Sequence, residues 1–467
     1  MINELIKGNY LIEEIQGDTL TPIAIFQKLK GKKKFLLESS LKHELSGRYS
    51  FIGTNPTFEL KGTNTETKII HANTEEIIYE KPLEVLKTFI PINHEVTANL
   101  PFVGGAVGFV GYDVIRAYEK IGEAPRDELN IPEVHFMVFE EMVVFDHLYQ
   151  KVYLIGIPLA KNTTREDLEK RLLARKNEIE SGIDYETKPV RISSFKGNMT
   201  KEEFIKKVEK AKQYIIEGDI FQVVLSQRMK ASIDGDPFSF YRKLRVKNPS
   251  PYMYYLDFED YVVAGTSPES LIKVTDQRVV TNPIAGTRPR GKTIEEDKQL
   301  ETQLLNDEKE LAEHRMLVDL GRNDIGRVSE FGTIQIDKYM QIERYKHVMH
   351  IVSEVSGKLK DSLIPLDALI ACLPAGTVSG APKIRAMEII NELEEFKRGV
   401  YSGAVGYFSA NGNINFALAI RTMFIKDGCA YIQAGVGIVH DSNPEKEYEE
   451  TLHKLKAFLE EDHDTTH

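Results

Sequence analysis

Two pairs of glutamates have the same spacing in distant parts of the sequence. Glu310 and Glu313 lie in EKELAEH, and Glu447 and Glu450 lie in EKEYEET. Residues three apart share one face of a helix, so each pair presents two carboxylates to the same side. Two such pairs facing each other could hold a hard divalent cation such as Mg²⁺ through oxygen ligands. The alternative is a pair of solvated helix faces, and spacing alone leaves both interpretations open.

Bare backbone amides and an arginine lie close to the second pair. Gly435 and Gly437 follow a β-rich run, where glycine lets a ligand approach the backbone. A β-bulge is the alternative interpretation. Arg421 stands in the apolar run FALAIRTMFI, predicted to be one strand, and it needs an anionic partner. That partner is either a clamped carboxylate ligand or a structural ion pair.

Three further stretches contain groups that could transfer a proton or bind an anion. Glu269, in GTSPESLIKV, follows a predicted strand, and apolar neighbours would raise its pKa enough for it to act as an acid. The small, hydroxyl-rich loop LPAGTVSGAPK precedes a predicted helix, whose N-terminus and Lys383 favour an anion. His350 lies in a largely apolar segment, which is more typical of a structural histidine.

Composition sets limits on the class of protein. The chain has 467 residues, of which 42% are apolar and 28% charged, with a net charge of −11. We expect a globular protein of two or three domains that binds no nucleic acid, since no basic stripe is present. No signal peptide and no apolar run of about 20 residues is found, so we expect no membrane span and a cytoplasmic location. Neither Cys372 nor Cys429 lies in a nucleophile motif, so the chain should not hydrolyse glutamine itself.

The elements that must position these residues alternate irregularly. Residues 1–160 are rich in predicted strands, and 164–181 form a charged amphipathic helix. In the next helix Thr200 and Glu203 form a capping box, and Gly218 ends it. Residues 295–324 are predicted to be one long helix. Because strands and helices do not follow a regular βα order, the pattern favours an α+β fold.

Two stretches of the sequence resemble each other. GGAVGFVGYD, at 104–113, is similar to SGAVGYFSANG, at 402–412. The likeness is either a coincidence between two small-residue strands or a trace of a duplicated sheet with one copy in each half.

Taken together, the motifs are far more specific than each alone. SPESLIKV, PIAGTRPRG, DEKELAEHRMLVDLGRND, VMHIVSEV, AGTVSGAPKIRAMEII, SGAVGYF, AIRTMF and QAGVGIVHDSNPEKEYEET occur in the order found in chorismate-utilising enzymes. The chain most resembles the component I (large-subunit) branch of the anthranilate synthases. The resemblance implies a sandwich of two large antiparallel β-sheets flanked by helices. It also makes 200–455 the chorismate-binding catalytic region. The polar stretch at 182–199 is predicted to be a linker, which leaves an N-terminal region (1–181) and a tail (456–467).

The resemblance implies a role for each candidate residue. Chorismate has a ring carboxylate and an enolpyruvyl carboxylate, and in these enzymes Mg²⁺ bridges the ring carboxylate to glutamates. Glu313 and Glu450 would be metal ligands, with Glu310 and Glu447 beside them. Glu269 would protonate the departing C4 hydroxyl, and His350 would assist that departure or the later loss of pyruvate. Thr377 and Glu310 are counted with these catalytic groups. The residues implied to hold the substrate are Gln222, Thr377, Tyr401, Arg421, Gly435, Gly437 and Lys454.

Two positions bear on which reaction is catalysed. Relatives that form isochorismate or salicylate have a lysine base where this chain has Gln222, and an amide cannot take up a proton at neutral pH. Ammonia, already nucleophilic, therefore fits better than water. PAGTVSGAPK, with Ala375 and Thr377, resembles anthranilate synthases, whereas aminodeoxychorismate synthases tend to read PGGSITGAPK. Ala285 does not separate the two branches. Component I of aminodeoxychorismate synthase stays the alternative, and a catalytically silent tryptophan-binding protein is a more distant one.

A second set of residues resembles a tryptophan feedback site. These residues are Glu38 and Ser39 in FLLESS, Pro251, Tyr252 and Met253 in NPSPYMYY, and Val405 and Tyr407. The alternative is that LLES is simply a buried strand end. The segment after Ser39 departs from the commoner family pattern, which leaves the strength of feedback open. The resemblance also implies a separate glutamine amidotransferase subunit, component II, in a heterotetramer with two of each subunit.

Overall fold

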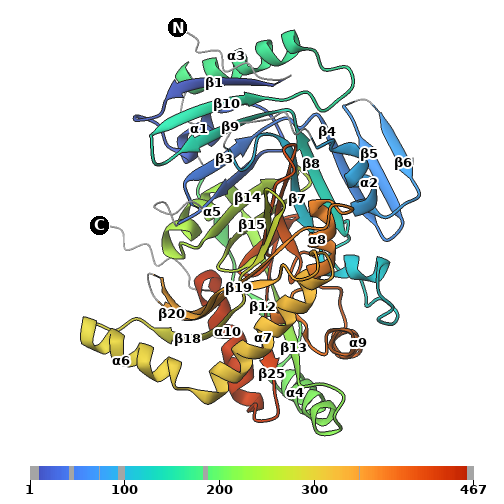
Figure 1. The fold of residues 1–467 in the computed structure, drawn as a ribbon, viewed down its shortest axis with the longest axis vertical. Coiled ribbons are helices and arrows are strands. Elements are labelled where there is room, and N and C mark those ends of the chain that lie inside the picture. The colour runs from blue at the N-terminus through green and yellow to red at the C-terminus, as the bar shows by residue number, and fades with distance from the viewer. Residues whose placement is uncertain are drawn as a thin grey trace.

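Two large antiparallel sheets form the frame of the protein. The computed structural model describes residues 10–40, 47–72, 74–92, 100–181, 188–345 and 348–459. Helices flank the sheets, with α3 at one end of the molecule and α6 and α7 at the other (Figure 1). The predicted α+β sandwich of two antiparallel sheets is confirmed.

The first sheet has 13 strands within the described residues. Its order is β1 (Leu11–Gln16), β10 (Lys151–Gly156), β9 (Glu141–Asp146), β3 (Tyr49–Gly53), β2 (Phe35–Glu38), β14 (Tyr252–Asp257), β15 (Tyr261–Ser267), β24 (Thr422–Lys426), β25 (Cys429–Ile438), β13 (Gln222–Asp234) and β11 (Arg191–Ile192). Two short strands also pair with β13, namely β12 (Lys196–Gly197) and β21 (Gly380–Ala381). One sheet therefore contains strands from both halves of the chain, with β1, β10, β9, β3 and β2 side by side and joined through β14 to later strands.

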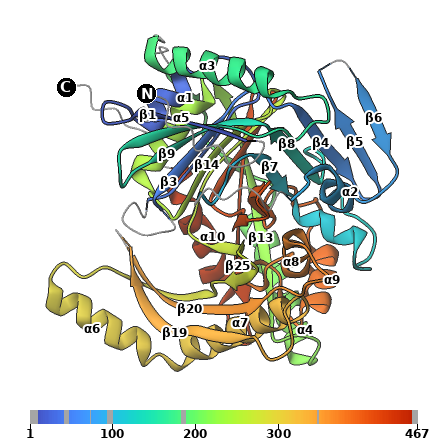
Figure 2. The same ribbon diagram turned by 45° about the horizontal axis from the view of Figure 1, so that its top comes forward.

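The second sheet has 12 strands within the same residues. Its order is β18 (Ile284–Pro289), β20 (Val348–Lys358), β17 (Arg278–Thr281), β16 (Ser270–Thr275), β23 (Ile414–Leu418), β22 (Ala404–Ser409), β7 (Gly105–Val110), β8 (Val134–Phe139), β4 (Phe58–Thr63), β5 (Glu66–Ile70) and β6 (Glu75–Ile78), and β19 (Gln335–Arg344) pairs with β20. Strands β19 and β20, with α6, form an arm that projects from the rest of the molecule (Figure 2).

The helices agree with most of the predicted positions. They are α1 (Pro22–Lys28), α2 (Pro82–Phe89), α3 (Arg165–Ser181), α4 (Lys201–Ile216), α5 (Pro237–Lys247), α6 (Ile294–Leu305), α7 (Glu308–Gly326), α8 (Pro365–Cys372), α9 (Lys383–Leu393) and α10 (Pro444–Leu459), with 3₁₀ turns η1 (Tyr112–Ala117) and η2 (Gly376–Val378). The capping box of α4 is confirmed: Thr200 Oγ1 accepts from the Glu203 N–H, and Glu203 Oε2 accepts from the Thr200 N–H.

The single long helix predicted over 295–324 is wrong. The chain forms α6 and α7 instead, and Asn306 and Asp307 separate them. The Asp307 carboxylate accepts hydrogen bonds from the N–H groups of Lys309 and Glu310, both at 3.2 Å, and so starts a new helix. An aspartate that can cap a helix competes with continuation of the preceding one. The break turns Glu310 into a first-turn residue of α7.

The single strand predicted for FALAIRTMFI is also wrong. Strand β23 ends at Leu418 in the second sheet, and β24 starts at Thr422 in the first. The chain crosses between the sheets at Ala419–Arg421, and Arg421 has a φ of +50°. This left-handed conformation is rare for a residue with a side chain. The crossing places Arg421 between the sheets instead of within one.

The two similar glycine-rich stretches lie side by side. They form β7 and β22, neighbouring antiparallel strands of the second sheet, with Gly108 opposite Gly406. They are thus partners in one sheet and do not lie in two separate copies of it.

The predicted domain boundaries can be compared with the strands around them. Within 182–199, residues 188–199 are described and contain β11 and β12, both paired with β13. Residues 456–459 continue α10, and 460–467 lie outside the described residues. The division into domains stays a prediction.

No helix among the described residues is both long and apolar enough to cross a membrane.

Candidate active site

The two glutamate pairs lie at the starts of α7 and α10. Glu313 Oε1 accepts a hydrogen bond from Gln222 Nε2 at 3.2 Å. Glu450 Oε1 lies 2.9 Å from Lys454 Nζ. Burial raises the pKa of Glu313, and the neighbouring carboxylate of Glu310 raises it further. Burial and then Glu450 raise the pKa of Glu447 in the same way.

The chemistry of these carboxylates fits a divalent cation. Lys309 and Lys454 both act on the pKa values of Glu313 and Glu447, so the two helix faces share one electrostatic environment. Crowded, partly buried carboxylates gain from a hard cation with oxygen ligands. However, the described residues contain no group of three or more His, Cys, Asp or Glu side chains placed to hold a metal ion. Carboxylate oxygens are thus the type of ligand that Mg²⁺ prefers, but the metal-ligand roles of the four glutamates stay a prediction.

Gly435 and Gly437, on β25, lie directly beneath the side chains of Tyr401 and Gln222, respectively. They pair regularly with β13, opposite Ser226 and Val224, so no bulge occurs there. A Cβ at Gly437 would come within 2.3 Å of Gln222 Nε2, and one at Gly435 within 2.7 Å of the Tyr401 hydroxyl. Both glycines are therefore needed for close approach.

The backbone of this strand also reaches α10, because Lys454 Nζ donates to the Gly435 carbonyl at 3.0 Å. Gln222, Tyr401, Lys454 and the two glycines are thus gathered in one place, as predicted for substrate-binding groups. Their binding roles stay a prediction.

Glu269 has the environment of a general acid. Thr377 Oγ1, in η2, donates to Glu269 Oε1 at 2.8 Å. Burial raises the pKa of Glu269 to about 7, although the Thr377 hydrogen bond and Lys454 both act to lower it. A carboxyl group that holds its proton near neutral pH can give it to a leaving group. Two residues more than 100 positions apart in the sequence are thus joined by a hydrogen bond, and their catalytic roles stay a prediction.

His350 lies on β20 and contacts two residues that the sequence does not predict. Its Nδ1 is 3.1 Å from the Gly286 carbonyl and 3.0 Å from Thr287 Oγ1. A carbonyl only accepts, so Nδ1 has the proton and Nε2 has the free lone pair. Burial lowers the pKa of His350, which keeps the ring neutral. PIAGTRPRG contains both contacts, but only the pairing of β18 with β20 brings them to the histidine.

Arg421 is a cation without compensation in the described part of the chain. Its guanidinium has neither a hydrogen bond nor an ion pair there, and burial lowers its pKa. Its charge also lowers the pKa of His350, so the two groups are near each other. An unpaired charge held away from water is costly and is typical of a site that binds an ion of opposite sign. The structural ion pair considered for Arg421 is absent from these residues.

Lys383 does not add its charge to the anion site expected at the start of α9. Its Nζ lies 2.7 Å from Asp324 Oδ2 on α7, and both groups are largely buried. The lysine neutralises this aspartate instead.

Comparison with known proteins identifies the family of this chain. The sequence profile that describes chorismate binding enzymes matches residues 32–460. This chain belongs to the chorismate binding enzyme family. It is similar to anthranilate synthase component 1 of Acetivibrio thermocellus, with 48% identity over 96% of this chain and 93% of that one.

Solved structures of the family share the fold. The crystal structure of anthranilate synthase component I from Streptococcus pneumoniae TIGR4 matches with a TM-score of 0.81 and 46% identity, covering 96% of this chain and 99% of that one. The menaquinone-specific isochorismate synthase from Escherichia coli matches with a TM-score of 0.73 and 17% identity, covering 97% and 95%. The second likeness shows the fold alone. The resemblance to component I proteins is confirmed, and the aminodeoxychorismate branch is not favoured.

All seven residues predicted to bind tryptophan line one small cavity between the sheets. The cavity has a volume of about 50 Å³, and its walls come from β2, β14, β22 and β23. Ligand pockets usually measure roughly 300 to 1,000 Å³, so tryptophan would have to open it. The sequence does not predict Phe51 or Asn415, which also line it and lie outside the motifs. Binding of tryptophan by this family member stays a prediction.

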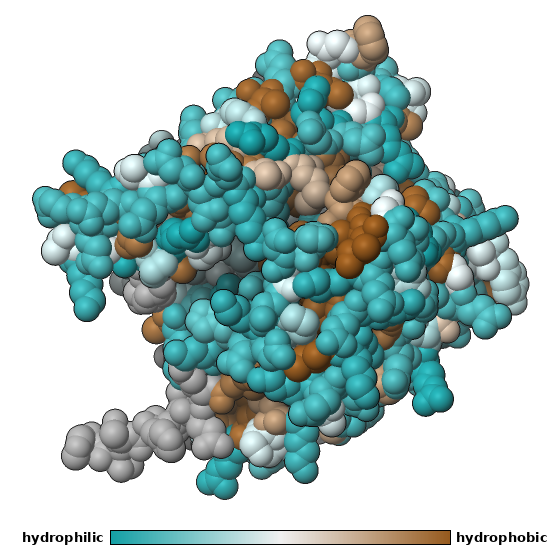
Figure 3. All heavy atoms as spheres, turned by 90° about the horizontal axis from the view of Figure 1, so that it is seen from below, coloured by the Kyte–Doolittle hydropathy of each residue, from teal (hydrophilic) through white to brown (hydrophobic). Residues whose placement is uncertain are grey.

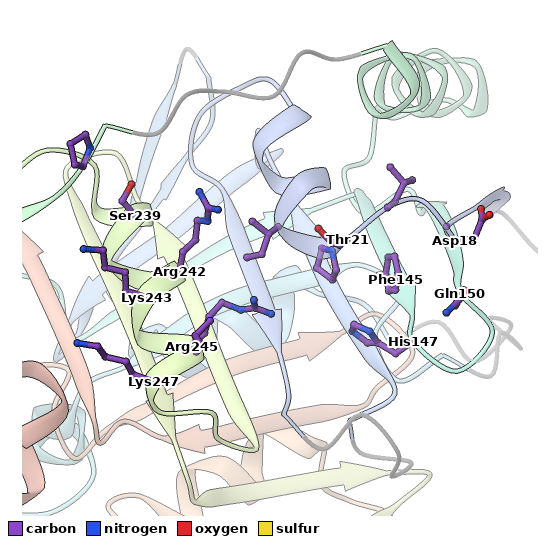
Figure 4. Close-up of a pocket in the computed structure, with 16 residues that line it drawn as sticks. Asp18, Thr21, Phe145, His147, Gln150, Ser239, Arg242, Lys243, Arg245 and Lys247 are labelled. Carbon is purple, nitrogen blue, oxygen red and sulfur yellow. The ribbon is translucent and has the colours of Figure 1, made fainter. Parts of the chain in front are cut away.

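The Glu38 carboxylate is already engaged. Arg245 donates to both of its oxygens at 2.9 Å, and the Tyr241 hydroxyl donates at 2.9 Å. Both partners lie on α5. Arg245 also lines a larger cavity of about 1,020 Å³ between α1, β9 and α5, whose basic side chains are shown in Figure 4. None of the residues predicted for chorismate or the metal lines that cavity.

A cleft borders the candidate tryptophan cavity and shares residues with it. It has a volume of about 620 Å³, and Ser39, Pro251 and Tyr252 form one wall. The cleft is also lined by Val352 and Glu354 of β20 and by Tyr345, which follows β19. The Tyr345 ring packs edge-on against His350 with centroids 5.6 Å apart. The face of the molecule seen from below is largely hydrophilic and hollowed near its centre (Figure 3).

Proposed function

We propose that this chain converts chorismate and ammonia to anthranilate and pyruvate, the first step of tryptophan biosynthesis. The observation that carries the proposal is the Glu269–Thr377 pair, an acid with a pKa of about 7 in a fold like that of anthranilate synthase component I. Arg421, without a partner in the described residues, and Lys454 supply positive charge for the two substrate carboxylates.

The reaction follows from these groups. Ammonia adds at C2 while the C4 hydroxyl takes the Glu269 proton and leaves as water. Gln222 cannot act as a base, so ammonia, which is already nucleophilic, fits the site better than water. Pyruvate is then eliminated and the ring becomes aromatic, with neutral His350 available through Nε2 to take up a proton. Mg²⁺, when bound, would neutralise charge on the ring carboxylate, and Glu313, Glu450, Glu310 and Glu447 are the residues that would hold it.

The proposal includes a partner, an inhibitor and a location. A glutamine amidotransferase subunit would supply ammonia, since neither cysteine lies in a nucleophile motif. Tryptophan would occupy the cavity between β2, β14 and β22 and inhibit by favouring a state that binds chorismate poorly. A cytoplasmic location and a heterotetramer with two of each subunit complete the proposal.

An assay of the purified chain alone tests it. Chorismate, ammonium and Mg²⁺ are supplied at alkaline pH, the product is identified by chromatography, and the assay is repeated with tryptophan. We expect ortho-aminobenzoate and pyruvate, both suppressed by tryptophan. Aminodeoxychorismate without pyruvate would instead assign the chain to the folate branch. No Mg²⁺-dependent turnover at all would indicate a silent binding protein.

A further inference from the structure

A buried arginine lies behind the candidate site. Arg398, just after α9, is only 2% exposed and is among the largest fully buried side chains. Its Nε and Nη2 donate to the two oxygens of Glu394 at 2.8 and 2.7 Å. A buried ion pair is a poor source of stability, because both charges lose their hydration. Stability alone therefore does not explain its place in the core.

The remaining N–H groups of Arg398 connect three other segments. Nη1 donates to the Val378 carbonyl at 2.7 Å and to Ser402 Oγ at 3.3 Å, and Nη2 donates to the Val224 carbonyl at 2.8 Å. All five donors of the planar guanidinium are thus used. The guanidinium also lies over the Tyr401 ring, 5.6 Å from its centroid.

Each of these segments contains a residue of the candidate site. Val378 follows Thr377 in η2, Val224 lies two residues after Gln222 in β13, and Ser402 follows Tyr401. Ser402 has a φ of +65°, a strained conformation that persists only where the surroundings impose it. Thr377 in turn donates to Glu269. A continuous path of hydrogen bonds and covalent bonds therefore leads from Arg398 to the proposed acid.

We propose that Arg398 is a positioning residue for the reaction: it holds η2 so that Thr377 reaches Glu269, and it holds Tyr401 over Gly435. It contacts none of the groups proposed to touch the substrate except the Tyr401 ring, and it acts through them. The inference rests on the proposed function and adds a residue to the site.

Arg398→Lys tests it. Lysine keeps the charge but has three donors on a flexible stem, so it cannot bind Glu394, Val378 and Val224 together. We expect kcat to fall about 10-fold to 100-fold, since small misplacements of reacting groups have effects of this size. We expect KM for chorismate to change less than about threefold, because the cations that hold its carboxylates are unchanged.

The pH profile separates positioning from a merely structural role. The Thr377 hydrogen bond stabilises ionised Glu269, so its loss raises the pKa of Glu269. The alkaline limb of kcat/KM should therefore move up by about one pH unit, and Thr377→Val gives the reference shift. Other charges that face Glu269 stay in place: Lys454 on α10, and the Asp324–Lys383 pair beside the same small cavity.

A matched control is Arg48→Lys. Arg48 makes a bidentate ion pair with buried Asp146 on β9, away from the candidate site. This variant should lose thermal stability, but its kcat and the alkaline limb of its kcat/KM profile should equal those of the unmodified protein. A folded, active Arg398→Lys protein with an unshifted limb would overturn the inference.

Ser402→Ala decides the question if Arg398→Lys does not fold. It removes one acceptor of Arg398 without leaving a charge unpaired, and it should move the limb in the same direction by less. An unchanged limb in that variant contradicts the inference equally. A failure of the proposed function is distinct, because the unmodified chain would then show no turnover of chorismate.

Discussion

At the scale of single residues, the site consists of ionisable groups whose pKa values are shifted by burial or whose charge has no partner in the described chain. Burial keeps Glu269 protonated to about pH 7 and keeps His350 neutral. Arg421 is held without a counterion in the described chain. Such groups cost stability and are retained where a ligand or a reaction uses them.

Glu269→Gln should remove the acid. The protonated form is the active one, so activity of the unmodified chain should fall as pH rises through about 7. The variant should lose about 10²-fold to 10⁴-fold in kcat and lack that limb. Rates are measured from pH 6 to 9 and expressed per free ammonia, because ammonium also titrates. Glu388→Gln, at a surface ion pair with Arg385, is the control. If the activity of Glu269→Gln still fell as pH rose through about 7, another group would be the proton donor.

Glu313→Gln should weaken the use of Mg²⁺. We expect the concentration for half-maximal activity to rise about 10-fold to 100-fold, as for other changes around a metal site. Burial and Glu310 raise the pKa of Glu313, so protons compete with the metal, and the Mg²⁺ requirement of the unmodified chain should increase as pH falls.

Matched variants sharpen this metal test. Glu450→Gln should behave like Glu313→Gln, while both keep tryptophan binding by calorimetry. Glu308→Gln, exposed on the same helix, should have no effect. A normal Mg²⁺ titration of Glu313→Gln would remove this residue from the metal site.

At the scale of elements, the candidate regulatory cavity is made by strands and not by a loop. Residues of β2 and β14 meet β22 and β23 across the two sheets, and Met253 pairs directly with Glu38. The Ser270 end of β16 pairs with Ala417, another wall of the cavity, so the strand after Glu269 borders the same space. Occupation of the cavity is therefore expected to bear on the position of Glu269.

Val405→Phe should fill this cavity and oppose tryptophan. Val405 is 2% exposed, and the larger ring would take up space that indole needs. The tryptophan concentration for half-inhibition should rise at least about 10-fold, since opening the cavity becomes harder. Turnover without tryptophan is measured in parallel, and the ratio is the readout. Val85→Phe, equally buried on α2, should lower stability but leave inhibition unchanged. Normal inhibition of Val405→Phe would place the tryptophan site elsewhere.

At the scale of the whole molecule, the two sheets are joined by polar contacts as well as by apolar packing. His135, on β8 of the second sheet, is 3% exposed. Its Nδ1 bonds the hydroxyl of Tyr261, on β15 of the first sheet, and its Nε2 lies 3.1 Å from Glu59 Oε2. Burial lowers the pKa of His135, while Glu59 opposes this and Lys33 and Lys61 add to it.

His135 should make stability depend on pH. Its folded pKa lies below its ordinary value, so as pH falls below about 6.5 the unfolded chain takes up a proton that the folded one does not. Stability should therefore decline as pH falls from about 6.5. Urea unfolding at pH 5.5 and 7.5 measures the difference, which should shrink in His135→Gln and persist in the exposed His440→Gln control. An equal pH dependence in all three proteins would mean that His135 does not contribute.

The sequence by itself determined what depends on neighbours along the chain. The capping box at Thr200 and the helix at 165–181 could be predicted because their hydrogen bonds and periodicity are local. The motifs identified the family, and the spacing of the glutamates placed each pair on one helix face. The break at Asp307 was within reach of local chemistry, because an aspartate can cap a new helix, but 295–324 was predicted as one helix.

Only the tertiary structure decided what depends on segments meeting across the sheets. Thr377 reaches Glu269, and Gln222 lies over Gly437, because strands and turns far apart in sequence are brought together. The crossing at Arg421 and the buried arginine Arg398 follow the same rule. Register and crossing points are fixed by the pairing of whole strands, and a side chain's burial and pKa follow from what then surrounds it. The spacing of residues along the sequence specifies neither the pairing of strands nor the surroundings of a side chain.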